Sequence, residues 1–94
     1  MKKETITKSS GNVFSDLGFS DEEAILLKLR SDLMAELRET ISRQGWTQTE
    51  TAVRLGIGQS RVSDLVRGKW EKFSLDMLVT LAVRAGRKIE LHAA

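Results

Sequence analysis

The longest regular pattern in this chain of 94 residues is a row of apolar positions that recurs at helical spacing between residues 21 and 45. The members of the row are Leu26, Leu29, Leu33, Leu37 and Ile41, with Leu27 and Met34 widening it. Residues three and four apart share one face of an α-helix, so the row predicts a helix of roughly 24 residues with a buried face. Ser20 and Glu23 predict a capping box at its start, and Gly45 predicts its end.

Residues 47–69 carry a second pattern, which predicts two short helices joined by a tight turn. Thr47 and Glu50 are spaced as a capping box, and Gly56 stands where a left-handed residue closes the first helix. Gly68 ends the second helix. The small or apolar positions that fill the angle between the two helices are Ala52, Ile57, Val62 and Leu65. Trp46 and Trp70 flank the pair and are interpreted as core anchors. The whole stretch predicts a helix-turn-helix.

After this stretch, Ser74 predicts the start of a further helix that stops at Gly86 and completes the core. Residues 87–92 alternate polar with apolar, which predicts a short strand. One strand cannot stand alone, so we expect it to pair with the same segment of a second subunit or with residues 5–7. The expected fold is therefore all-α, a helix-turn-helix bundle with a short C-terminal β-strand.

The chain divides into an N-terminal arm (residues 1–20), a central domain (21–86) and the C-terminal strand (87–94), which we interpret as a dimer contact. Positions in the arm and the long helix are too apolar to be left in water, as are two in the strand. They are Val13, Phe14, Leu17, Ile25, Leu27, Ile89 and Leu91, the expected dimer or partner interface. Two alternatives stay open: the arm covers the domain's own core, or the long helix breaks and its first part folds back.

The second short helix presents polar side chains opposite its apolar face, which is the geometry of a helix that reads base edges in the major groove. The expected base-reading residues are Gln59, Ser60, Arg61 and Ser63. Arg61 suits guanine and Gln59 suits adenine, although Arg61 can instead pair with Asp64. The expected phosphate-binding residues, at helix ends or in the basic segment that follows, are Thr47, Gln48, Arg67 and Lys69.

Composition excludes several other functions. The chain has no cysteine and a single histidine, so disulfides, thiolate sites and multi-histidine metal sites are excluded, and no cofactor is expected. We do not expect an enzyme, because His92 has no evident group to orient it. No signal peptide or membrane span is expected, and the absence of cysteine favours the cytoplasm. Residues 46–72 carry a net charge of +2, against −2 for residues 21–45, so the basic part coincides with the helix-turn-helix.

The helix-turn-helix is similar to that of the lambda repressor and Cro class, the XRE family. The resemblance covers roughly residues 33–86 and rests on Ala52, on the turn Gly56, Ile57 and Gly58, and on the TQTETA and SRVSDLVRGK segments. Family members commonly carry serine or threonine where this chain has Gly58, so the cap of the second helix is expected to be weaker. The resemblance implies a sequence-specific transcription repressor that binds double-stranded DNA.

The segments around the motif resemble small stand-alone XRE proteins of the HigA-like antitoxin type. They are SSGNVFSDLGFSDEEA before the long helix, and FSLDML and GRKIEL after the motif. This resemblance implies a homodimer that binds a palindromic operator, represses its own operon and neutralises a RelE/HigB-like toxin. The alternatives are a solitary XRE-type regulator without a toxin and a protein-interaction module that has lost DNA binding.

Overall fold

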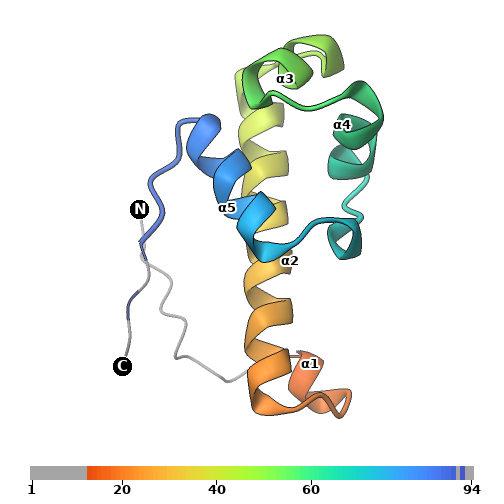
Figure 1. The fold of residues 1–94 in the computed structure, drawn as a ribbon, viewed down its shortest axis with the longest axis vertical. Helices are drawn as coiled ribbons and strands as arrows, with labels where there is room; N and C mark the ends of the chain where they lie inside the picture. The colour runs from red at the N-terminus through yellow and green to blue at the C-terminus, as the bar shows by residue number, and fades with distance from the viewer. Residues whose placement is uncertain (1–12, 91, 93–94) are drawn as a thin grey trace.

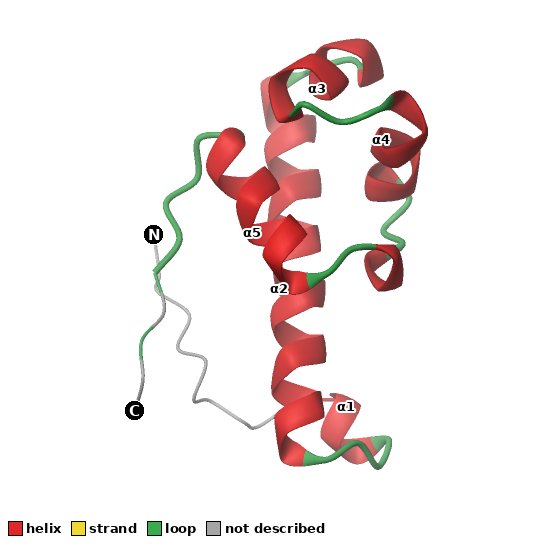
Figure 2. Cartoon of the chain, in the orientation of Figure 1, coloured by secondary structure: helices red, strands yellow, loops and turns green. Residues whose placement is uncertain are grey.

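A computed structural model describes residues 13–90 and 92, which fold into helices around one small core (Figures 1 and 2). The elements, in chain order, are α1 (Val13–Asp16), α2 (Asp21–Gln44), α3 (Gln48–Leu55), α4 (Gln59–Val66), the 3-10 helix η1 (Trp70–Lys72) and α5 (Leu75–Arg84). Figure 1 shows α2 running through the whole molecule, with α1 at one end, α3 at the other, and α4 and α5 along its length.

The long helix α2 begins and ends where the sequence predicts. The Ser20 hydroxyl accepts a hydrogen bond from the Glu23 amide at 3.2 Å, and the Glu23 carboxylate accepts one from the Ser20 amide. Gly45 closes the helix in the left-handed conformation, with φ 72°. The helix is continuous over Asp21–Gln44, so its first part does not break away and fold back.

The core lies where α2, α5 and the two short helices meet, and aliphatic side chains fill most of it. The largest apolar side chains in it are at most 1% exposed: Leu37, Leu55, Val62, Leu65, Phe73, Leu78 and Leu81. Trp46 and Trp70 are half-buried and pack against this cluster, which confirms that both anchor the core. Burying a side chain of this size contributes roughly 1.5–3 kcal/mol relative to leaving it in water, so the cluster holds the short helices against α2.

Helices α3 and α4 form the predicted helix-turn-helix. The Thr47 hydroxyl accepts from the Glu50 amide at 3.0 Å, and the Glu50 carboxylate accepts from the Thr47 amide at 2.9 Å. Gly56 has φ 70° and donates its amide to the carbonyl of Ala52, which ends α3. Ile57 follows in the turn and packs against the core. The sequence predicts each of these caps because each depends on residues only a few positions apart.

Helix α1 is a feature that the sequence did not predict. Its bounds, Val13–Asp16, span about one helical turn, so no apolar spacing can recur within it. Phe14 attaches this helix to the domain, because its ring meets those of Phe19 at 6.2 Å and Trp70 at 5.7 Å, edge to face in both cases. Part of the arm therefore covers its own domain, whereas Val13 and Leu17 stay exposed.

The predicted C-terminal β-strand is wrong for the residues that the structure describes. Residues 87–90 follow α5 without forming a strand. A strand forms only with a neighbour to complete its hydrogen bonds, and no strand occurs elsewhere in the described parts of the chain. Arg87 instead pairs with Glu36 and donates to the Thr40 hydroxyl at 3.3 Å, which ties the segment to α2. Residues 5–7 and Leu91 lie outside the described residues.

Candidate nucleic-acid interface

The second helix of the motif, α4, has one buried face and one polar face. Val62 and Leu65 are 0% exposed and fix the buried face against the core. Gly58 precedes the helix and makes no side-chain cap, as expected from its missing hydroxyl. Gln59 and Ser60 are exposed in the first turn, so their side chains are accessible to a ligand that approaches this end of α4.

The predicted base-reading residues do not all have the same surroundings. The Gln59 amide nitrogen lies 3.4 Å from the Thr49 hydroxyl, a long hydrogen bond that links the first turns of α4 and α3. Ser60 is exposed, whereas Ser63 is half-buried one turn further along. Gln59 and Ser60 are therefore both accessible at the start of α4, whereas Ser63, one turn later, is less exposed.

Arg61 lies in a place that the sequence did not indicate. Its guanidinium carbon is 4.6 Å from the centroid of the Phe73 ring, a cation–π contact, and its side chain is half-buried. Among the described residues it forms no ion pair with Asp64, the alternative partner. To reach a base edge the guanidinium must leave Phe73, which costs roughly 0.5–2 kcal/mol against the roughly 1–3 kcal/mol of a bidentate base contact. Its role as a base reader stays a prediction.

The predicted phosphate-binding residues form two groups. Thr47 and Gln48 are exposed at the start of α3, where helix amides and the helix dipole favour an anion. The Thr47 oxygen already accepts the cap bond from Glu50, but its hydroxyl hydrogen is still available to a phosphate oxygen. Arg67 and Lys69 follow the last turn of α4, with Arg67 exposed and Lys69 half-buried. The two groups thus lie at the start of α3 and the end of α4.

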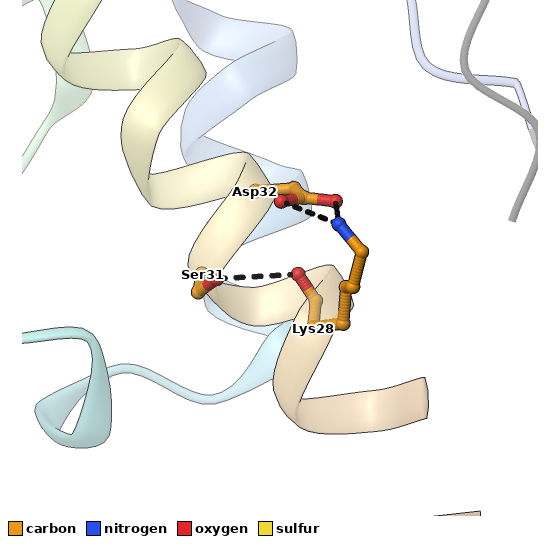
Figure 3. A network of polar contacts seen from close by, with 3 residues as sticks. All are labelled: Lys28, Ser31 and Asp32. Atoms are coloured by element: carbon orange, nitrogen blue, oxygen red, sulfur yellow. Dashed lines mark hydrogen bonds and ion pairs between the residues drawn. The ribbon is translucent and has the colours of Figure 1, made fainter. Parts of the chain in front are cut away.

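Some cations outside the helix-turn-helix form ion pairs, whereas Arg30, Arg38 and Arg84 bond to backbone carbonyls instead. Lys28 pairs with Asp32 at 3.0 Å one turn apart on α2 (Figure 3), and Arg43 lies 3.6 Å from Glu39. By contrast, no carboxylate among the described residues lies within ion-pair distance of the basic residues between 46 and 72. These basic residues are Arg54, Arg61, Arg67, Lys69 and Lys72. Together with Glu50, Asp64 and Glu71 they leave residues 46–72 with a net charge of +2, which favours contact with a polyanion.

Two arginines outside the motif hold its helices, and sequence reasoning missed both. Arg84 of α5 donates to the Leu55 carbonyl at the end of α3 at 2.8 Å. Arg38 of α2 donates to the Val66 carbonyl at the end of α4 at 3.0 Å. A cation at a helix C-terminus is favourable because the carbonyls there carry partial negative charge. No local spacing indicates such contacts, since the partners lie far apart in the chain.

The predicted interface residues lie away from α3 and α4, at the α1 end of the molecule and on the C-terminal segment. Leu17 is 68% exposed and Ile25 is 43% exposed. Val13 and Ile89 are also exposed, whereas Phe14 and Leu27 are half-buried. Leu91 lies outside the described residues. The exposed members of this set are therefore accessible to a partner.

Comparison with known families agrees with this geometry. The family model described as a helix-turn-helix domain matches residues 13–94, nearly the whole chain. The chain therefore belongs to the helix-turn-helix domain family, a class of DNA-binding regulators. No curated protein matches it. Among the described helices, none combines the length and hydropathy that crossing a membrane requires.

Proposed function

We propose that the chain is a sequence-specific transcription repressor that reads duplex DNA with the first turn of α4. The observation that carries the proposal is the start of this helix, where Gln59 and Ser60 are exposed opposite the buried Val62 and Leu65. To enter the major groove, a recognition helix needs polar side chains in its first turn and an opposite apolar face that packs against the protein core. The unpaired cations of the motif supply the attraction to the phosphates.

We propose further that the protein acts as a homodimer on a palindromic operator. Helix-turn-helix dimers bind two half-sites roughly 34 Å apart, so a two-fold pair of chains suits a two-fold DNA site. Val83 on α5 is 56% exposed and Ile89 on the following segment is 38% exposed, which leaves apolar surface for a second subunit. Sedimentation equilibrium at tens of micromolar tests this proposal, since a monomer that persists at that concentration would contradict it.

The antitoxin role is the more specific part of the proposal. It is supported by the resemblance to HigA-like proteins and by the charge of the α1 end. Residues 13–27 contain four acidic residues, all exposed, and no lysine or arginine. The acidic residues are Asp16, Asp21, Glu22 and Glu23. Pairing this surface with its own copy would place like charges together, which is unfavourable, whereas a basic partner is attracted. A RelE/HigB-like toxin is the partner that we propose for it.

The proposed place of action is the cytoplasm, where duplex DNA is available, and the proposed action is binding without catalysis. His92 lies 3.1 Å from Glu90 on the exposed C-terminal segment, and the proposed mechanism assigns its imidazole no role.

Two experiments test the proposal in order. First, the protein is titrated with the duplex upstream of its own gene and with random duplex at two salt concentrations; a repressor prefers the upstream duplex, and its affinity falls as salt rises. Absent or salt-insensitive binding would favour an interaction module instead.

Second, the neighbouring reading frame is expressed with and without this chain. The antitoxin role is supported if that frame encodes a basic protein of about a hundred residues whose toxicity this chain relieves. A neighbouring gene without toxicity would favour a solitary regulator.

A further inference from the structure

The guanidinium of Arg38 lies directly against the end of α4. Its Nε donates to the Val66 carbonyl at 3.0 Å, two residues before Gly68. A β-carbon at position 68 would lie 3.0 Å from Nη1 of Arg38 and 3.4 Å from its Cζ. The guanidinium can therefore lie beside the backbone because residue 68 has no side chain. Gly68 also has φ 75°, so the position suits glycine for two separate reasons.

Most of the hydrogen-bonding capacity of Arg38 remains unused. A guanidinium carries five N–H donors, and the bond to Val66 occupies only one of them. The side chain is exposed, and no carboxylate among the described residues lies within ion-pair distance of it. The two residues that flank Gly68 are Arg67 and Lys69, which we assign to phosphate binding. Arg38 thus adds a third cation at the end of α4.

The bond to Val66 also changes the electrostatics of this helix end. The C-terminus of a helix carries a partial negative charge of roughly half an elementary charge, which repels a phosphate. A guanidinium bonded to one of the last carbonyls offsets that charge, and the Nη groups of Arg38 keep N–H donors that no hydrogen bond among the described residues uses. The bond fixes the planar group in one orientation, so little side-chain freedom remains to be lost when an anion binds.

We propose that Arg38 is a DNA phosphate contact, which together with Arg67 and Lys69 forms a three-cation site at the end of α4. The inference rests on the proposed DNA binding and deepens it, because the third cation comes from α2, outside the helix-turn-helix. Such a contact is independent of base sequence and fixes the rotation of α4 in the groove relative to the long helix.

Arg84 provides a matched control within the same chain. It makes the same kind of bond, to the Leu55 carbonyl at 2.8 Å, and its Nη1 lies 3.2 Å from where a β-carbon of Gly56 would be. The residues that flank Gly56 are apolar, Leu55 and Ile57, and they supply no further cation. Arg84 therefore holds a helix end at which neither residue beside the glycine is a cation, so its loss should weaken the fold and leave the number of phosphate contacts unchanged.

The experiment measures the affinity of the full chain for random-sequence duplex DNA between 50 and 150 mM salt, with Arg38→Met, Arg38→Lys and Arg84→Met. For Arg38→Met, we expect the slope of log K against log salt to fall in magnitude by about 0.9, one phosphate contact. The ratio of the affinity of the unmodified chain to that of this variant then falls about 2.7-fold as salt rises from 50 to 150 mM. Arg38→Lys keeps the slope because it keeps the charge. Arg84→Met keeps the slope although it lowers the melting temperature.

A second measurement uses the unmodified protein, so it does not depend on how the variants fold. Random duplex should protect Arg38 from phenylglyoxal, an arginine-specific reagent, several-fold more than it protects Arg84, as read by mass spectrometry. An unchanged slope in a folded Arg38→Met variant, or equal reactivity of Arg38 with and without DNA, would overturn the phosphate contact alone. If the unmodified chain bound no duplex at all, the proposed function would be overturned as well. The failure of the Arg38 contact can therefore be distinguished from the failure of DNA binding.

Discussion

Phe14 and Trp70 meet edge to face with their ring centroids 5.7 Å apart. This contact joins α1, at one end of the long helix, to the 3-10 turn that follows α4. The Arg30 guanidinium lies 5.2 Å from the centroid of the same Trp70 ring and donates through Nε to the Phe73 carbonyl at 3.1 Å. The segment after α4 is thus held from α1 and from α2.

Replacing Phe14 by alanine should release α1 while leaving the rest of the domain folded. Each aromatic pair of this kind contributes roughly 0.5–1.5 kcal/mol, and Phe14 takes part in two. We expect a loss of about 1–3 kcal/mol, with a fall in melting temperature and an altered tryptophan fluorescence. Val13→Ala, at an exposed position of the same helix, is the control and should change stability by less than about 0.5 kcal/mol. Equal losses in the two variants would contradict the role of the aromatic contacts.

Replacing Gly58 by serine should stabilise the protein. The residue has φ −74° and ψ 162°, which any amino acid adopts at a helix start, and a β-carbon there would meet no atom within 4 Å. Serine adds a cap bond worth a few tenths of a kcal/mol and restricts the unfolded chain, so we expect a gain of about 0.5–1 kcal/mol by thermal unfolding. Gly58→Ala restricts the unfolded chain without the cap. If alanine stabilises as much as serine, the missing cap is not the reason.

Arg61 and Lys69 should fail in different ways when replaced by alanine. Arg61→Ala should reduce the preference for operator over random duplex by about tenfold, in the lower part of the range for a base contact because the guanidinium must leave Phe73. Lys69→Ala should weaken binding to both duplexes equally and lower the salt slope by about one. Titration at two salt concentrations measures both quantities, and the reverse pattern would show that the two roles are exchanged.

Leu17→Ser together with Ile25→Ser should leave the fold intact and weaken binding of the proposed toxin. Both side chains are exposed, at 68% and 43%, so their loss removes little from the domain's own core. Burial of each against a partner contributes roughly 1.5–3 kcal/mol, so we expect at least a tenfold loss of affinity by calorimetry with the neighbouring gene product. Val53→Ser, exposed on α3, is the control. Unchanged affinity in the double variant would remove this surface from the interface, and a lost dimer would assign it to the second subunit.

The sequence predicted those parts of the fold that depend on residues close together in the chain. Both capping boxes, at Ser20 and Thr47, and the left-handed Gly45 and Gly56 occur as expected. The Ser74 hydroxyl likewise accepts from the Met77 amide at 3.1 Å to begin α5. In each capping motif the hydrogen-bond donor and acceptor lie within about one helical turn of each other, so a short stretch of sequence is enough to predict the cap.

Features that depend on distant parts of the chain were not predictable in the same way. Alternation over residues 87–92 resembles a strand, but a strand requires a neighbour that the pattern itself does not contain. Helix α1 is too short for periodicity to appear. In the candidate site, the exposure of Gln59 and Ser60 followed from the face of α4, whereas the contact of Arg61 with Phe73 and the arginine bonds from α2 and α5 are long-range.

The two glycines that close α3 and α4 each share their space with an arginine from another helix, Gly56 with Arg84 and Gly68 with Arg38. A side chain at either glycine meets two penalties, one from the backbone conformation and one from the guanidinium. Only the second is relieved when the arginine is shortened, so the two changes in a pair are not additive. Loss of the arginine therefore removes only one of the two constraints on its glycine, so in related sequences glycine should persist at both positions even where the arginine has changed.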